Sequence, residues 1–161
     1  MANETSYFQM LAMQPKALRH PDKLETSHNN STQTIAFSVR LENDAYLYAG
    51  DVVPFNDVIA NEGGHYSSDN HTFTCPRRGM FVFSMRITSF AYSYAGADMV
   101  RNDVLLASAL ANGEVWTDSS STTVVTECDE GDAVHVKVWC SGTFEGFLAP
   151  CTFTGFLLNP I

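Results

Sequence analysis

Aromatic side chains stand beside carboxylates and hydroxyls at three places in the chain, an arrangement that could bind a sugar. Aromatic faces stack on sugar rings, and Asp, Asn or Ser side chains hydrogen-bond the sugar hydroxyls. The pattern predicts a ligand site formed by these residues, and the alternative is that the tyrosines pack between subunits of an oligomer. The three places are Tyr46 and Tyr48 beside Asp44, Tyr92 and Tyr94 within residues 89–98, and Trp116 beside Asp118 and Ser119.

Carboxylates concentrate in two stretches of the chain that contain no Lys or Arg. Calcium prefers oxygen ligands, which carboxylate-rich loops supply, so these stretches raise the hypothesis of a calcium site. The alternative is that the carboxylates are solvated and keep the protein in solution. The first stretch holds Glu42, Asp44, Asp51, Asp57, Glu62 and Asp69, and the second holds Asp103, Glu114, Asp118, Glu127, Asp129, Glu130 and Asp132.

The sequence contains none of the common catalytic signatures, such as G-x-S-x-G, H-E-x-x-H, a P-loop or a dinucleotide fingerprint. We therefore expect a protein that is not an enzyme. Of the five histidines, only His65 and His71 could meet across a turn. A hydrated surface pair is the simpler interpretation of those two than a metal site.

Length and charge narrow the function classes further. The 161 residues are 45% hydrophobic, which suits one domain with a core, and the formal net charge is -9. Phosphate recognition needs clustered cations, so the anionic surplus excludes a nucleic-acid binder. The same charge disfavours anionic membranes, and no apolar run reaches the length of a membrane span, so we expect no membrane insertion.

The chain divides by composition at about residue 34. Residues 1–34 are polar apart from a short apolar patch before Pro15, which is too short for a helix that is stable alone in water. We expect this tail to be disordered, or to be ordered only by docking or oligomerisation. Residues 35–161 form the predicted globular head.

Apolar and polar residues alternate with a period of two through much of the head, as half-buried strands require. Runs bounded by turn residues and the absence of a three-turn helical pattern predict an all-β fold, either a sandwich or a jelly roll. A collagen-type Gly-X-Y tract is absent. The predicted strands are residues 35–41, 81–88, 98–110, 122–128, 134–138 and 152–158, and the expected turns include Asn112-Gly113 and Glu130-Gly131-Asp132.

The head resembles the globular head of complement component C1q. The residues that carry the resemblance are IAFSVR at 35–40, VPFNDV at 53–58, GHY at 64–66, FTCP at 73–76, GMFVF at 79–83, EGDAV at 130–134 and FTGFLL at 153–158. The resemblance implies a jelly roll of two antiparallel sheets that assembles as a trimer, like tumour-necrosis-factor-like ligands. We interpret the matched aromatics as core. They are Phe37, Phe55, Tyr66, Phe73, Phe81, Phe83, Phe153 and Phe156.

The resemblance also bears on calcium, because many relatives bind it through acidic residues after an Asn-Gly turn. Here Asn112-Gly113 matches that turn, and Asp118 is the residue to which the metal role carries over. The following loop is shorter than the family commonly has. We therefore expect calcium, if it binds, to use Asp118.

The four cysteines lack C-x-x-C spacing, so disulfides are favoured over zinc. Cys140 ends one predicted strand and Cys151 opens the next, and a bridge between them would contribute about 3 kcal/mol by closing the loop. We predict that pair. Cys75 falls where the family often carries a buried free thiol, and a second bridge to Cys128 stays open if their strands are neighbours.

Glycosylation sequons begin at Asn29 and Asn30 in the tail and at Asn70 in the head. Together with the resemblance they predict a secreted, extracellular protein. The expected function is a homotrimeric recognition module without a collagen stalk, lectin-like, which binds glycans, glycoproteins or microbial surfaces. The alternatives are a protein ligand that bridges cell-surface receptors and a calcium-binding matrix protein.

Overall fold

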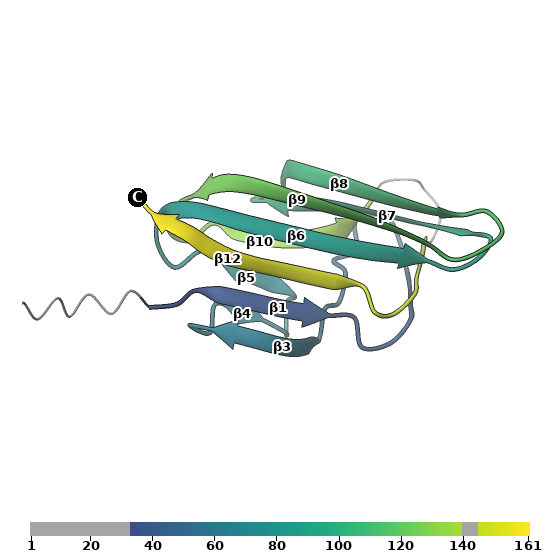
Figure 1. Cartoon of the computed structure of the whole chain (residues 1–161), viewed down its shortest axis with the longest axis horizontal. Coiled ribbons are helices and arrows are strands. Elements are labelled where there is room, and N and C mark those ends of the chain that lie inside the picture. Colours follow the sequence, from purple (N-terminus) through teal and green to yellow (C-terminus); the bar gives the residue numbers. More distant parts are fainter. Residues whose placement is uncertain (1–32, 140–144) are drawn as a thin grey trace, which may run out of the picture. The chain divides into compact units, whose positions relative to one another are not determined.

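The computed structural model describes residues 33–139 and 145–161, and every regular element in those two ranges is a β-strand (Figure 1). The strands follow the predicted alternation of buried and exposed residues, most clearly in β6 and β10. Their bounds are β1 Ala36–Arg40, β2 Ala45–Leu47, β3 Asp57–Glu62, β4 Tyr66–Ser67, β5 Thr72–Thr74, β6 Gly79–Ser89, β7 Ser93–Arg101, β8 Val104–Gly113, β9 Asp118–Cys128, β10 Ala133–Val138, β11 Glu145–Phe147 and β12 Thr152–Pro160.

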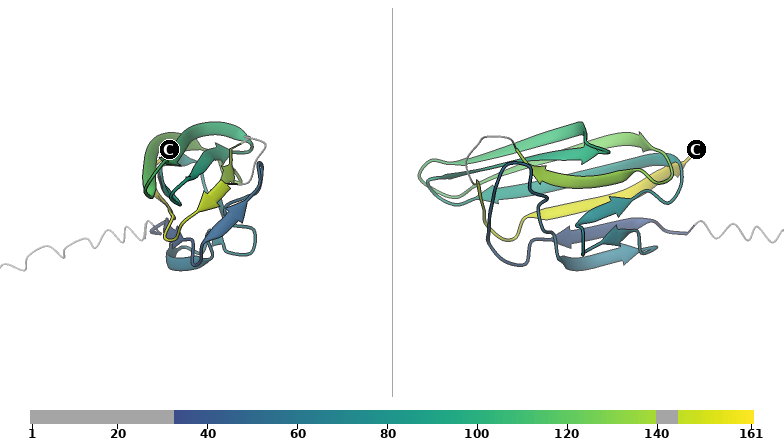
Figure 2. Two further views of the ribbon diagram at one scale, coloured as in Figure 1. Left: turned by 90° about the vertical axis from the view of Figure 1, so that its right-hand side faces the viewer. Right: turned by 180° about the vertical axis from the view of Figure 1, so that it is seen from behind.

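The strands form two antiparallel sheets that pack face to face (Figure 2). In the first sheet the order is β2-β11-β6-β12-β1-β3, and β9 also pairs with β6 along its full length. The second sheet has the order β4-β5-β10-β7-β8. Neighbours far apart in the chain, such as β1 beside β12, are typical of a jelly roll. The predicted all-β, two-sheet antiparallel jelly-roll sandwich is confirmed.

Aromatic rings fill the space between the sheets. Phe37 lies at the centre, stacked on Tyr66 at 5.1 Å and on Phe73 at 4.8 Å, with Phe153 edge-on at 4.9 Å. Such aromatic pairs stabilise a core beyond their simple burial. The structure therefore confirms the predicted core residues, with the exception of Phe156: Phe37, Phe55, Tyr66, Phe73, Phe81, Phe83 and Phe153 are all buried.

The prediction for Phe156 is wrong, because this side chain is 41% exposed. Phe153 and Gly155 face the core, so their even-numbered neighbours in β12 point to the outer face of the first sheet. Gly155 keeps the inward position because a Cβ there would lie 2.5 Å from Cδ1 of Phe83 and 2.6 Å from Cε1 of Phe37.

Two turn assignments also differ from the sequence prediction. Residues 98–110 are not one strand, because Asn102 and Asp103 adopt positive φ values of 49° and 63° and form a two-residue hairpin between β7 and β8. Conversely, Asn112 and Gly113 remain in β8, and the chain turns afterwards, at residues 114–117. The turn expected at Gly131 is present, with φ 88°.

The described cysteines are free, buried thiols: Cys75, Cys128 and Cys151. Cys75 and Cys128 hydrogen-bond each other; this bond and burial raise the pKa of Cys75, and the same bond lowers the pKa of Cys128. They are thus neighbours, as the second bridge requires, but are not bonded covalently here. Cys151 donates to the Leu148 carbonyl at 3.3 Å, while Cys140 lies outside the described residues, so its pairing with Cys151 stays a prediction.

Most of the predicted tail, with Asn29 and Asn30, also lies outside the described residues. Asn70 is described and is exposed in the turn between β4 and β5, and its glycosylation stays a prediction. Among the described residues no helix is long and apolar enough to cross a membrane.

Candidate functional site

Two loops meet at one end of the head. Residues 90–92 connect β6 to β7, and residues 114–117 connect β8 to β9. The register places them together, because Ser89 pairs with Asp118 and Ser93 pairs with Gly113. At the other end of β6, Gly79 pairs with Pro160 near the C-terminus. The loops therefore lie roughly 33 Å from the C-terminal strand end, at the right of Figure 1.

A pocket open to solvent, with a volume of about 280 Å³, lies between these loops. Pockets for drug-sized ligands hold roughly 300–1,000 Å³, so this one suits a single small ring or group. Its lining combines two aromatic rings with hydroxyl, amide and carboxylate groups. The lining residues are Tyr92, Ser93, Tyr94, Asn112, Gly113 and Glu114.

Hydrogen bonds within the β8–β9 loop fix the floor of the pocket. The Asn112 N–H donates to Oδ2 of Asp118 at 2.9 Å, and the Glu114 N–H donates to the Asn112 carbonyl at 3.1 Å. A Cβ on Gly113 would collide with the Phe90 carbonyl and lie 2.8 Å from that of Trp116, so only glycine lets the two loops pack this closely. These bonds and the close approach at Gly113 therefore hold the β8–β9 loop against the β6–β7 loop.

Tyr92 is the most unusual residue of the site. Its backbone has φ 61°, a left-handed conformation that is strained for a bulky residue, and its side chain is 80% exposed. Tyr94, on the same face of the pocket, is 58% exposed. Strained backbone conformations of this kind cluster at binding and active sites. They persist there because the surrounding structure compensates for their energetic cost.

Tyr46 packs against the β6–β7 loop beside the pocket. Its ring stacks on Phe90 at 5.3 Å with an interplanar angle of 13°. Gly146, which pairs with Tyr46, packs against Phe90 and Ser93: a Cβ there would lie 2.7 Å from the Phe90 ring and 3.1 Å from the Ser93 hydroxyl. The predicted residue Tyr46 therefore contacts a loop of the site without lining the pocket.

The other predicted ligand residues divide between the site and its surroundings. Trp116 follows the pocket-lining strand end, and its ring is 80% exposed beside the pocket. Tyr48 does not line the pocket; its N–H donates to Asp51 in a separate turn. Ser119 is also outside it, because its hydroxyl bonds Thr88 at 2.9 Å and accepts from Arg86 at 3.1 Å. The structure thus brings Tyr92 and Tyr94 together in the pocket, places Trp116 in the adjoining β8–β9 loop outside the lining, and leaves Tyr48 and Ser119 elsewhere.

Three lining residues, Ser93, Asn112 and Glu114, are not among the ligand residues that the sequence predicts. In the sequence Asn112 belongs to an expected turn and Glu114 to a carboxylate-rich stretch. In the sequence these residues stand close to Tyr92, Tyr94 and Trp116, and this proximity could have indicated them. Only the pairing of Ser93 with Gly113 shows that the two loops are adjacent.

The described residues contain no group of three His, Cys, Asp or Glu side chains that could hold a metal ion. Oδ2 of Asp118 accepts from the Asn112 N–H at 2.9 Å. Calcium binding through Asp118 stays a prediction. His65 and His71 are at opposite ends of the β4–β5 hairpin, since His65 lies opposite Thr74 and His71 is in the turn.

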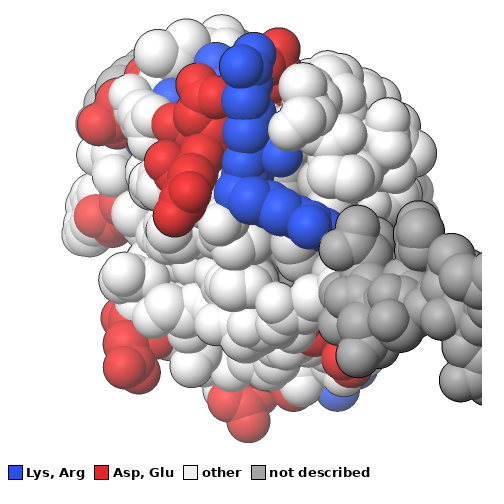
Figure 3. Space-filling view, turned by 90° about the vertical axis from the view of Figure 1, so that its left-hand side faces the viewer, with Lys and Arg blue, Asp and Glu red and all other residues white. Residues whose placement is uncertain are grey.

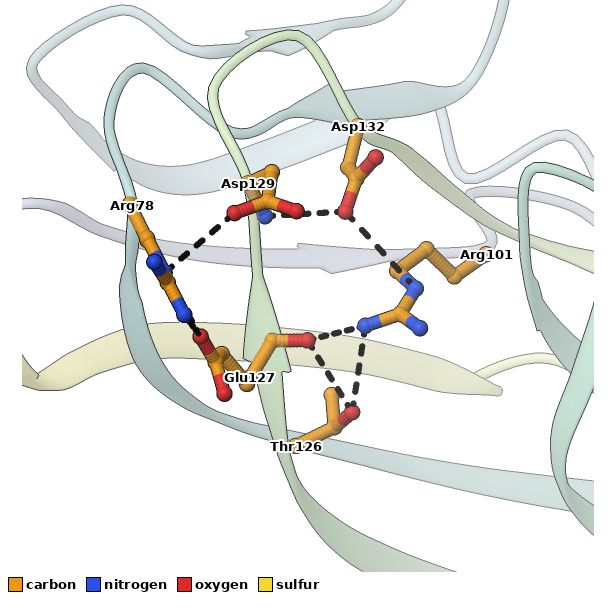
Figure 4. A network of polar contacts seen from close by, with 6 residues as sticks. All are labelled: Arg78, Arg101, Thr126, Glu127, Asp129 and Asp132. Atoms are coloured by element: carbon orange, nitrogen blue, oxygen red, sulfur yellow. Dashed lines mark hydrogen bonds and ion pairs between the residues drawn. The ribbon is translucent and has the colours of Figure 1, made fainter.

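A second polar cluster lies at the opposite end of the head, where Lys and Arg side chains run beside Asp and Glu (Figure 3). Arg78 pairs with Glu127 and with Asp129 at 3.4 Å, and Arg101 pairs with Asp132 at 3.7 Å (Figure 4). The hydrogen bond and charge of Glu127 raise the pKa of Arg78. Because Arg78 and Arg101 each have a carboxylate partner on another element, these pairs tie strand ends together.

Comparisons with known proteins identify a family whose model matches the head and several solved structures with a similar fold. The C1q domain family model matches residues 36–158. The globular domain of the zebrafish complement 1qA protein matches with a TM-score of 0.68 and 21% identity, covering 79% of this chain and 99% of that one. Eiger TNF from S. frugiperda matches at 0.61 and 10%, covering 80% and 95%. Murine APRIL at pH 5.0 matches at 0.59 and 12%, covering 78% and 99%. At these identities the structural likeness concerns the fold.

Proposed function

The chain belongs to the C1q domain family, and from this premise we propose that it is a lectin-like recognition protein that binds a sugar in the pocket between the β6–β7 and β8–β9 loops. Domains of this family are generally recognition modules without catalytic activity, and they are typically trimeric and extracellular. The family alone does not define a ligand, because one fold hosts many functions.

The exposure of Tyr92 on a strained backbone is the observation that carries the proposal. A sugar ring offers an apolar face to aromatic side chains and hydroxyls to polar ones. In this pocket Tyr92 and Tyr94 supply the aromatic faces, while Ser93 and Asn112 supply a hydroxyl and an amide. The pocket's small volume favours one sugar residue at the end of a chain over a long oligosaccharide.

Binding by one small pocket is weak, so we propose that three heads act together. Val125, Val82 and Phe156 lie side by side on the outer face of the first sheet, and Val125 and Phe156 are 54% and 41% exposed. A second copy of the head is the proposed occupant of this apolar row. In a closed three-fold arrangement all pockets point the same way, and avidity then follows from effective concentration.

A protein-ligand role is the second candidate, favoured by the 80% exposure of Trp116 outside the pocket. Exposed tryptophans are enriched among the residues that dominate protein interfaces. A receptor contacting Trp116 and the neighbouring tyrosines would use the same end of the head. Secretion, which both roles need, is part of the proposal and agrees with the exposed Asn70.

Binding to a broad array of glycans and microbial polysaccharides tests the proposal, in calcium and in chelator. We expect selective binding that Tyr94→Ala abolishes. Tyr48→Ala is the matched control, because Tyr48 is exposed to a similar degree, 67% against 58%, and lies outside the pocket. An array without any binding overturns the lectin role and favours the protein-ligand role. Loss of binding in chelator would support the calcium prediction for Asp118.

A further inference from the structure

The pocket carries one charged side chain, and it is negative. Glu114 lines the pocket and is exposed, and among the described residues no hydrogen bond or ion pair engages its carboxylate. The neighbouring carboxylate, Asp118, is by contrast bound by the Asn112 N–H at 2.9 Å. Glu114 therefore has both carboxylate oxygens available to a ligand, whereas Oδ2 of Asp118 already accepts a hydrogen bond within the loop.

Positive charge is absent from both loops of the pocket. Neither residues 87–100 nor residues 102–136 contain Lys or Arg, and the whole chain has a net charge of -9. Arg86 bonds Ser119 on the outer face of the first sheet and is not among the pocket-lining residues. An anionic ligand would thus meet a carboxylate with no cation to offset it, while a cationic ligand would meet a partner.

The aromatic rings, like the Glu114 carboxylate, favour a cationic ligand. The face of a tyrosine ring attracts a cation placed over it, and an ammonium group has both hydrogen-bond donors and a full positive charge. Tyr92 and Tyr94 line the same pocket as Glu114, so the pocket combines aromatic side chains with a carboxylate. A neutral hydroxyl can satisfy the carboxylate but gains nothing from the ring quadrupole.

Building on the proposed sugar-binding function, we infer that the pocket selects a protonated amino sugar, of the glucosamine type, over its N-acetylated form and over acidic sugars. The Glu114 carboxylate accepts from the ammonium group, and the tyrosine faces contact the ring and the cation. N-acetylation removes the charge and adds bulk in a pocket of about 280 Å³. Acidic sugars are repelled by the same carboxylate.

The test compares oligomers of glucosamine with oligomers of N-acetylglucosamine of equal length, by titration calorimetry on the full chain. We expect wild type to bind the glucosamine oligomer about tenfold more tightly at low salt, the size expected of one charge contact near the surface. Glu114→Gln should bring the ratio close to one, because it weakens binding of the glucosamine oligomer more than binding of the acetylated one. The control is Glu130→Gln, which removes an equal charge from an exposed position in another loop and should leave the ratio as in wild type.

The outcomes separate this inference from the proposed function. Equal binding of both oligomers by wild type overturns the charge selectivity and leaves the sugar-binding function standing. Loss of both oligomers in Glu114→Gln also overturns it, because the carboxylate would then accept from hydroxyls in general. If neither oligomer binds, the inference is wrong, and the glycan array decides separately on the proposed function. A ratio that falls equally in Glu130→Gln would assign the effect to net charge and would overturn the role of Glu114.

Discussion

At the scale of single residues, Tyr66 packs its ring into the core and hydrogen-bonds the neighbouring segments of the chain. Its hydroxyl donates to the Phe55 carbonyl at 2.8 Å, and burial raises the pKa of this phenol. The Asn61 side chain holds the Tyr66 backbone from the other side, accepting from its N–H at 3.1 Å and donating to its carbonyl at 2.9 Å. A buried hydroxyl with one partner should contribute measurably to stability, because its loss leaves a buried carbonyl unpaired.

We expect Tyr66→Phe to lower the free energy of unfolding by about 1–2 kcal/mol, since the ring packing is kept and only the hydroxyl is removed. Urea denaturation measures the change. Tyr94→Phe is the control and should have no effect, because that ring is largely exposed. A Tyr66→Phe protein as stable as wild type would mean that water replaces the bond to Phe55.

His135 in β10 makes stability depend on pH. Desolvation lowers its pKa below the ordinary value of 6.5, opposed by the charge of Asp103 and assisted by that of Lys137. The unfolded chain therefore binds this proton first as pH falls, so the contribution of His135 is favourable above about pH 6.5 and is lost as pH falls through the folded pKa.

We expect His135→Gln to lose less stability than wild type between about pH 6.5 and pH 5, and to follow it in parallel above pH 7. Thermal unfolding at a series of pH values gives both curves. Identical slopes below pH 6.5 would contradict the assignment.

At the scale of elements, β12 limits how closely the aromatic rings of the core can pack against the first sheet. It pairs with β1 on one side and β6 on the other, and its Gly155 lies against the rings of Phe37 and Phe83. A tightly packed interior does not absorb an added methyl group without moving these rings.

We expect Gly155→Ala to lower the free energy of unfolding by about 1–3 kcal/mol through overpacking. Gly131→Asn is the matched control: that glycine has φ 88° with open space around it, and asparagine tolerates positive φ better than other residues. Chemical denaturation of both variants decides the matter. Equal losses would show that backbone freedom, not packing, is what matters at Gly155.

At the scale of the whole molecule, the described head differs in its side chains at the two ends and carries an apolar row on the outer face of the first sheet. The pocket is at the end away from the C-terminus, and the paired arginines and carboxylates are at the other. Between them, the outer face of the first sheet exposes Phe156 and Val125. A trimer built on this face would present three pockets in one direction.

We expect wild type to be a trimer at micromolar concentration by native mass spectrometry, and Phe156→Asp to be a folded monomer, because a carboxylate in a packed apolar interface has no partner. Leu105→Asp, at an exposed position beside the β7–β8 turn, should remain trimeric. A monomeric wild type would remove the basis of the avidity argument. Far-UV circular dichroism confirms that the monomeric variant is folded.

The sequence by itself determined the fold class and most of the core. Alternation of apolar and polar residues is a local property, because a strand places every second side chain on one face, and the runs through Phe81 and Val134 displayed it directly. The family resemblance, carried by motifs spread through the head, agreed with that pattern and implied the two-sheet arrangement. Tyr92, Tyr94 and Trp116 were recognisable as candidates from residue type alone.

Only the tertiary structure decided which of those candidates meet. Ser89 lies beside Asp118 and Ser93 beside Gly113 because of long-range strand pairing, which makes Glu114 a neighbour of Tyr92 and Tyr94. Local patterns do not encode such register. The composition of the pocket is therefore a property of the folded head.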